Sequence, residues 1–168
     1  MKTDCQAAQR YWEDKEAADA AMPRPQLLKA AEDFIAAHNT CALATGCGGF
    51  VRCTPIEYTY RDGRFWLLSE GGLKFRALAQ NPAVCLAIFD PYGGFGTLGG
   101  MQVSGRARLV DPWSPDYCAL LAFKKIPEAA LRGLDHPMYL IEVTPGRIDL
   151  LNSAFKAQGF APRQHLTF

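Results

Sequence analysis

Residues 50–69 have the sequence FVRCTPIEYTYRDGRFWLLS. From Phe50 to Tyr60 the side chains alternate between two faces, which is typical of a β-strand rather than a helix. Asp62-Gly63 follows, and this dipeptide is typical of a two-residue hairpin turn. Residues 65–69 then predict a second strand, so this stretch favours a fold built from antiparallel strands.

Further strands and a few helices are predicted on both sides of this stretch. Strands are expected at 40–45, 84–89, 138–143 and 147–151, and a long one at 101–110. A bulge is expected at Gly105, and a turn at Pro145-Gly146 between the last two strands. Helices are expected at 4–21, from Pro25 to His38-Asn39, and at 73–80, 114–125 and 128–134. This pattern predicts a mainly β (α+β) fold, a small antiparallel barrel with flanking helices, with an open α+β sheet as the alternative.

Composition bounds the classes of protein to which the chain can belong. Its 168 residues are 49% hydrophobic and 21% charged, which excludes intrinsic disorder and suits one domain over residues 1–168. Within it, residues 1–24 are expected to form an N-terminal helical extension, and residues 152–168 a tail without a strong pattern. The net charge of +1 predicts no nucleic-acid partner. No long apolar run or signal peptide is apparent, which predicts no membrane partner and a cytoplasmic location.

The six cysteines do not indicate a metal site, because no pair has the two-residue spacing of a zinc knuckle. Free thiols are expected, since no secretory signal precedes them. Cys41 and Cys85 are predicted to be small apolar residues of strands.

A candidate anion site lies where the strand ending at Ser69 meets the next helix. Ser69 is followed by Gly71-Gly72 and then by Lys74 in the first helical turn. Unpaired backbone N–H groups at such a position favour an anion, glycines allow it to approach, and Lys74 can add a charge. The simpler interpretation is that the glycines only turn the chain and that Lys74 is solvated.

A second candidate site is the strand around Pro55. Proline lacks an N–H, so the strand cannot be fully paired there and can offer free backbone groups to a ligand. Arg52, nearby on the same strand, can bind a phosphate or stabilise an anion. Alternatively, this is an edge strand in which Pro55 prevents aggregation.

Several motifs, taken in order, resemble the pyridoxamine 5'-phosphate oxidase-like family. They are Cys41–Thr45, Arg52–Ile56, Asp62–Ser69, Lys74–Leu78, Asn81–Val84 and Val103–Asp111. The resemblance implies a split antiparallel β-barrel that binds FMN at a homodimer interface and takes a small-molecule substrate.

The resemblance also implies which residues bind the cofactor. The flavin-contacting strand corresponds to Arg52, Cys53, Thr54, Pro55, Ile56 and Glu57. A second contact corresponds to Leu68 and Ser69, the phosphate-binding basic pair to Leu73 and Lys74, and a flavin-contacting glutamine to Gln102. Only Lys74 keeps the basic character of that pair. No catalytic side chain is assigned.

Two departures from the family pattern bear on the activity. Glu57 stands where true pyridoxine-phosphate oxidases carry a lysine for the substrate phosphate. Their C-terminal Arg-x-His signature, with its nearby tryptophan, is not assigned here, because Arg163-Gln164-His165 is similar to it in letters only and no tryptophan follows Trp113. We therefore expect an FMN-dependent oxidoreductase for a small acceptor, of the flavin, nitro or quinone reductase type, rather than a vitamin B6 oxidase. The alternative is a non-catalytic flavin- or haem-binding protein, or a haem-degrading relative in which His165 binds the iron. Tyr92 and Phe95 could cover a bound flavin or simply anchor their loop.

Overall fold

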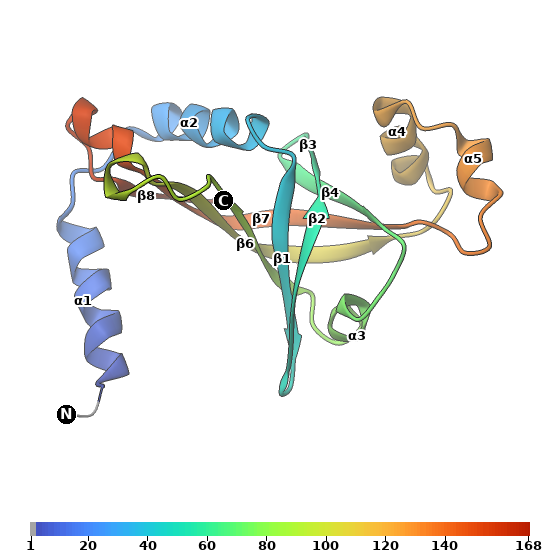
Figure 1. Cartoon of the computed structure of the whole chain (residues 1–168), viewed down its shortest axis with the longest axis horizontal. Helices are drawn as coiled ribbons and strands as arrows, with labels where there is room; N and C mark the ends of the chain where they lie inside the picture. Colours follow the sequence, from blue (N-terminus) through green and yellow to red (C-terminus); the bar gives the residue numbers. More distant parts are fainter. Residues whose placement is uncertain (1–2) are drawn as a thin grey trace.

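The alternating residues form one antiparallel sheet in the computed structural model, which describes residues 3–168 (Figure 1). The eight strands follow the order β2-β1-β5-β6-β7-β4-β3, and β8 pairs with β7. The strands are β1 (Thr40–Cys47), β2 (Phe50–Glu57), β3 (Thr59–Arg61), β4 (Arg64–Ser69), β5 (Ala83–Phe89), β6 (Gly99–Val110), β7 (Tyr139–Asn152) and β8 (Arg163–Thr167). The sheet curls into a split barrel, so the predicted fold class is confirmed.

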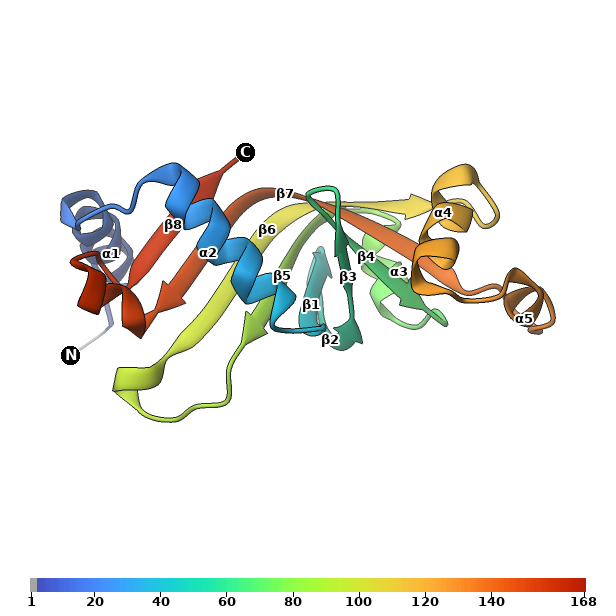
Figure 2. The same ribbon diagram turned by 90° about the horizontal axis from the view of Figure 1, so that it is seen from above.

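Helices flank the sheet at both ends (Figure 2). They are α1 (Cys5–Ala18), α2 (Arg24–Ala36), α3 (Lys74–Leu78), α4 (Pro115–Lys124) and α5 (Glu128–Arg132), with short 3-10 helices η1 (Phe95–Thr97) and η2 (Ser153–Gln158). The predicted apolar stripe of α2 is confirmed, because Leu27, Ala31 and Ile35 are buried against the sheet. No helix among residues 3–168 is long and apolar enough to cross a membrane.

The predicted hairpin and bulge are both confirmed. Asp62 and Gly63 have φ values of 54° and 74°, the left-handed backbone that a tight hairpin turn between β3 and β4 requires. The register of β6 against β7 shifts between Ser104 and Gly105. A Cβ at Gly105 would lie 2.5 Å from the carbonyl oxygen of Thr144, so close backbone approach requires glycine there.

The strands differ from the prediction in three places. Residues 138–143 and 147–151 are not two strands joined by a turn, because β7 runs without interruption through Pro145-Gly146, opposite the bulge at Gly105. No strand was predicted in the tail, where β8 pairs with β7 and buries Gln164 and Leu166. The strand predicted over residues 50–60 is broken at Tyr58, whose buried hydroxyl donates a hydrogen bond to the carbonyl of Ile35 over 2.7 Å.

Two hydrophobic cores hold the fold together. The larger one fills the barrel beneath α2, and burial there raises the pKa of the Cys41 thiol to about 12. This confirms Cys41 as an apolar strand residue. The smaller core gathers Val110, Tyr117 and Leu140 beneath α4.

The two faces of the sheet carry different side chains. We call the face toward the barrel core the inner face and the opposite one the outer face. Arg52 and Val84 flank Thr45 in the register, and all three share the inner face. One row of register partners crosses the outer face; it comprises Pro55, Ala42, Ala87, Gln102, Asp149 and His165.

Candidate functional site

The predicted anion site forms a cluster at the α3 end of the barrel. Gly71 and Gly72, with φ values of 119° and 99°, turn the chain from β4 into α3, a backbone that favours glycine. The Ser69 hydroxyl accepts a hydrogen bond from the Gly71 N–H over 3.1 Å. The Lys74 ammonium donates to the carbonyl of Gly71. Ser69 and Lys74 therefore meet at Gly71, and the interpretation of a solvated Lys74 is wrong, because this residue is only 7% exposed.

Arg52 adds a second positive charge to this cluster. Burial lowers the pKa of Lys74, and the neighbouring guanidinium of Arg52 lowers it further. Among the described residues, no ion pair joins a carboxylate to either Arg52 or Lys74. Two cations thus converge without a protein counterion, which is an arrangement suited to an anion.

Thr45 is a member of this cluster that the sequence prediction did not assign. It is 3% exposed, and its Oγ1 is the one buried side-chain oxygen or nitrogen within residues 3–168 that lacks a hydrogen-bond partner. It lies beside Arg52 in the register of β1 and β2. A buried hydroxyl without a partner costs stability unless a ligand completes its hydrogen bond. The signal in the sequence was a polar residue at an inward position of an apolar strand.

These residues fit a phosphate group. A phosphate ester carries three acceptor oxygens and up to two negative charges. The cluster offers two cations, the hydroxyls of Ser69 and Thr45, and a glycine turn that permits close approach. Residues that could hold the phosphate of FMN are therefore Arg52, Lys74, Ser69 and Thr45.

The strand that carries Arg52 lies at an edge of the sheet. Within the described part of the chain, β2 pairs with β1 and with no other strand, so its second backbone edge is open. Both interpretations of Pro55, as an edge-strand residue and as a gap open to a ligand, are compatible with this position. Thr54 and Ile56 share the inner face with Arg52, whereas Cys53 and Pro55 lie on the outer face.

Two other predicted contacts are placed differently. The side chain of Leu68 packs into the core beneath α4, on the side of β4 opposite to Ser69, so only its backbone could meet a ligand in this cluster. Leu73 precedes α3 and is 59% exposed.

The carboxylate of Glu57 forms an ion pair with a lysine. Its carboxylate accepts a hydrogen bond from the Lys124 ammonium over 2.8 Å, and the same ammonium lies 3.2 Å from the hydroxyl of Thr59. The negative charge that stands in place of the family's lysine is therefore paired within the chain. Lys124 is far away in the sequence and comes from α4, so no local motif could have indicated it.

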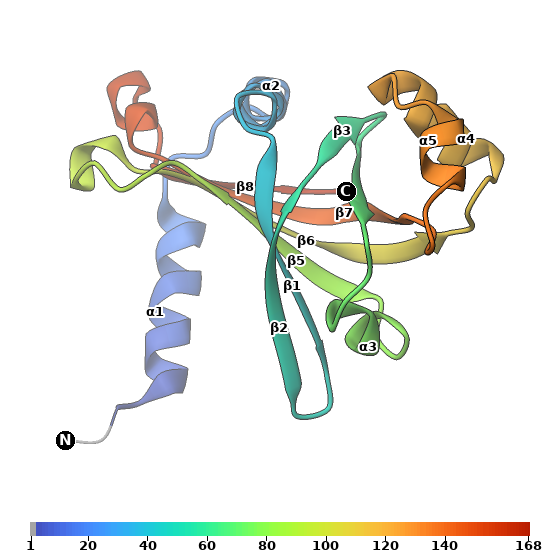
Figure 3. The ribbon, with the colours of Figure 1, turned by 45° about the vertical axis from the view of Figure 1, so that its right-hand side comes forward.

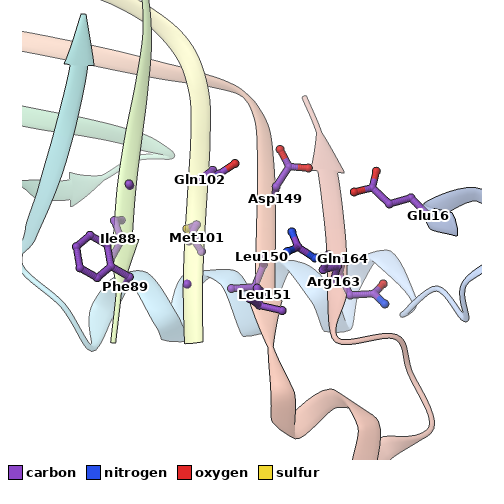
Figure 4. A pocket seen from close by; sticks show the side chains of 12 residues that line it. Glu16, Ile88, Phe89, Met101, Gln102, Asp149, Leu150, Leu151, Arg163 and Gln164 are labelled. Atoms are coloured by element: carbon purple, nitrogen blue, oxygen red, sulfur yellow. The ribbon is translucent and has the colours of Figure 1, made fainter. Parts of the chain in front are cut away.

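Gln102 lies apart from the cluster, on the outer face of β6. There it borders a pocket of about 200 Å³ together with Asp149 of β7 and Glu16 of α1 (Figure 4). Gln102 and Asp149 are register partners, and the Asp149 carboxylate accepts hydrogen bonds from Arg147 over 2.8 and 3.0 Å. The structure thus brings Arg52, Ser69 and Lys74 together on the inner side and leaves Gln102 on the opposite side of the sheet.

Comparison with solved structures shows the same fold in proteins of low sequence identity. Campylobacter jejuni ChuZ aligns with a TM-score of 0.66 at 13% identity, covering 99% of this chain and 70% of its own. A FAD-binding protein of Mesorhizobium loti aligns with a TM-score of 0.59 at 16% identity, covering 72% and 89% of the two chains. HutZ, a heme storage protein of Vibrio cholerae, aligns with a TM-score of 0.58 at 18% identity, covering 73% and 89%.

A comparison with curated proteins gives no match. A family model does match, and it spans the residues that form all of the barrel except β8. The model is that of pyridoxamine 5'-phosphate oxidase, and it covers residues 27–152, from the first buried residue of α2 to the end of β7. Both the fold and the sequence therefore lead to one conclusion: this chain belongs to the pyridoxamine 5'-phosphate oxidase family.

Proposed function

We propose that the protein is an FMN-dependent oxidoreductase that acts on a small, neutral acceptor. The observation that carries the proposal is the pair of cations, Arg52 and the buried Lys74, that converge on the inner face without a carboxylate partner among the described residues. An uncompensated buried ammonium costs free energy, and a bound phosphate would repay that cost. Bound FMN would supply the hydride or electron transfer.

The chain's own residues would bind and orient the cofactor. Lys74, Arg52 and Ser69 would hold the phosphate, and Thr45 would donate its unpaired hydroxyl to a phosphate oxygen. The open edge of β2 supplies backbone groups along the rest of the ligand. The barrel core beneath Thr54 and Ile56 gives that edge a rigid support.

We propose further that the functional form is a homodimer. Gln102 faces outward and cannot reach a ligand at Arg52 and Lys74 of its own chain, because the sheet lies between them. A second copy could present its Gln102 to that ligand across a two-fold axis. Each site would then contain residues of both chains.

Complementation between inactive variants tests this shared site. Arg52→Ala and Gln102→Ala chains are co-expressed with different tags, and the mixed dimer is purified. If each site uses both chains, one of the two sites of a mixed dimer is intact, and it binds FMN with wild-type affinity while each parent dimer binds weakly. If Arg52 and Gln102 serve one site within a chain, the mixed dimer binds as weakly as its parents.

The pair formed by Glu57 and Lys124 bears on the substrate. Their opposite charges leave no free cation there for a substrate phosphate, and the Thr59 hydroxyl further occupies the Lys124 ammonium. We therefore infer an uncharged acceptor, such as a quinone or a nitro compound, rather than a phosphorylated vitamer.

The absorption spectrum of the purified protein, followed by a turnover assay, tests the function. Flavin bands and steady-state oxidation of reduced nicotinamide with a quinone or nitro acceptor are expected. Flavin bands without turnover would indicate a carrier or sensor. A Soret band, lost in His165→Ala, would instead indicate a haem protein and would refute the proposal.

A further inference from the structure

The loop between β5 and β6, residues 90–98, extends beyond the sheet beside η2 (Figure 3). It has glycine at positions 93, 94 and 96, and none of its residues is buried. Tyr92 and Phe95 are 72% and 84% exposed and contact each other edge-on, with 6.1 Å between their ring centroids, so the rings do not anchor the loop to the body. A segment with few buried contacts opens at low cost, and the polar contacts at its two ends therefore decide where this loop lies.

Two side chains from distant parts of the chain hold the ends of this loop. The Ser153 hydroxyl of η2 donates a hydrogen bond to the carbonyl of Phe95 and accepts one from the N–H of Leu98, each over 3.1 Å. At the other end, the Asp90 carboxylate lies 3.0 Å from Nε2 of His38, which follows α2. We call the contact between His38 and Asp90 the latch. The hydroxyl of Ser153 does not titrate near neutral pH, whereas a histidine does.

The geometry of the latch requires a proton on each nitrogen of the His38 ring. Nδ1 lies 2.8 Å from the carbonyl oxygen of Phe34, and Nε2 faces the carboxylate of Asp90. A carbonyl and an ionised carboxylate can only accept hydrogen bonds, and only the imidazolium form of histidine has two N–H donors. The ring also stands at the C-terminal end of α2, where the helix dipole favours a positive charge. The latch is therefore closed by a charged histidine.

The titratable groups of the neighbouring elements have partners or ionisation states that leave the latch unchanged. Asp33, on the last turns of α2, is paired with Lys29 over 2.7 Å. The hydroxyl of Tyr58 donates to a carbonyl at the end of the same helix, and burial raises the pKa of this tyrosine, so it stays neutral. Asp90 is the carboxylate that the structure pairs with His38. The charge of the histidine itself therefore decides the state of the latch.

We propose that the latch is a pH-sensitive hold on the loop, closed while His38 carries both ring protons and open when one of them is lost. A neutral ring keeps one N–H, so the lone pair of its other nitrogen faces an oxygen that repels it. The ring turns to relieve this repulsion, and because the turn moves both nitrogens, the hold on Asp90 is lost. Histidine side chains titrate between about pH 5 and 8, so the loop is released as the pH rises through this range.

Opening of the latch changes the rim of the pocket beside Gln102. Phe89 and Gly100 flank the loop on β5 and β6, and both line that pocket. The latch uses no residue of the cluster at Gly71, so the inference goes beyond the proposed function and its test needs no cofactor.

Hydrogen–deuterium exchange of the full-length protein, read by mass spectrometry on peptides that contain residues 90–98, tests the latch. The rates are corrected for the pH dependence of exchange in unstructured peptides, so that they report how often the loop opens. Opening should increase about threefold between about pH 5.5 and about pH 8, as expected for the loss of a partly exposed ion pair. A corrected rate that is equal at both pH values would overturn the inference.

Four variants assign the effect to the latch. His38→Gln and Asp90→Asn each remove one member of the charged pair, and both should abolish the dependence of loop opening on pH. Ser153→Ala removes the contact that does not titrate, so opening should increase at both pH values while the ratio between them stays that of the wild type. His136→Gln removes another histidine, which is exposed and lies outside the loop, and should leave the ratio unchanged. A wild-type ratio in His38→Gln or in Asp90→Asn would overturn the inference.

Discussion

Replacement of Lys74 by alanine or methionine should weaken FMN binding without unfolding the protein. The Lys74 ammonium is buried, lies beside Arg52, and donates only to the Gly71 carbonyl among the contacts described. A charge-assisted hydrogen bond to phosphate contributes about 1.5–3 kcal/mol, which corresponds to a dissociation constant raised about 10- to 150-fold. Quenching of FMN fluorescence during titration of the apoprotein measures this constant.

The control for this experiment lies on the same helix. Arg76 is two residues further on and stacks over the Phe50 ring at 4.8 Å, and it is not among the charges that lower the pKa of Lys74. Arg76→Ala removes an equal charge and should change FMN affinity little. An unchanged affinity in Lys74→Ala, or equal losses in both variants, would refute the assignment of Lys74 to the phosphate.

Because the pKa of Lys74 is lowered, both the stability of the apoprotein and its affinity for FMN should depend on pH. Since the folded apoprotein holds the Lys74 proton less tightly than the unfolded chain, apoprotein stability should rise with pH between the lowered pKa and the ordinary value of 10.5. FMN affinity should move in the opposite direction, because deprotonation removes the charge that binds the phosphate. Lys74→Met should abolish both trends, and chemical denaturation at several pH values measures the first.

Three further predictions concern single positions. Thr45→Val removes a buried hydroxyl that has no hydrogen-bond partner, so the stability of the apoprotein should not fall. FMN should bind more weakly by about 1 kcal/mol, because the hydroxyl would no longer donate to the phosphate. An FMN affinity equal to that of the wild type would show that Thr45 does not belong to the site. Gly105→Ala places a Cβ against the Thr144 carbonyl and should destabilise the fold by about 1–3 kcal/mol in urea unfolding, and an unchanged midpoint would contradict the close approach. The wild-type protein should oxidise pyridoxamine 5'-phosphate negligibly because Lys124 is already paired with Glu57, and turnover of about 1 per second or more would refute this reasoning.

Local features were predictable because short-range chemistry decides them. The alternation of residues 50–57, the turn at Asp62-Gly63 and the apolar stripe of α2 each depend on neighbours within a few positions, and the structure confirms all three. The bulge at Gly105 was predictable for the same reason. Errors occurred where a distant strand decides the outcome: β8 is a strand because β7 supplies its hydrogen bonds, and its five residues are too few to show a period.

The candidate site shows the same division. The sequence was sufficient to indicate Arg52, Ser69 and Lys74, because a basic residue beside a proline-interrupted strand and a glycine turn before a helix are local signals. The tertiary structure alone decided that Arg52 and Lys74 share the inner face while Gln102 faces outward, and that Lys124 neutralises Glu57. The alternating pattern indicates only that neighbouring side chains point to opposite sides of a strand. The direction in which the sheet curls decides which side becomes the interior. That direction follows from the pairing of strands that lie far apart in the chain.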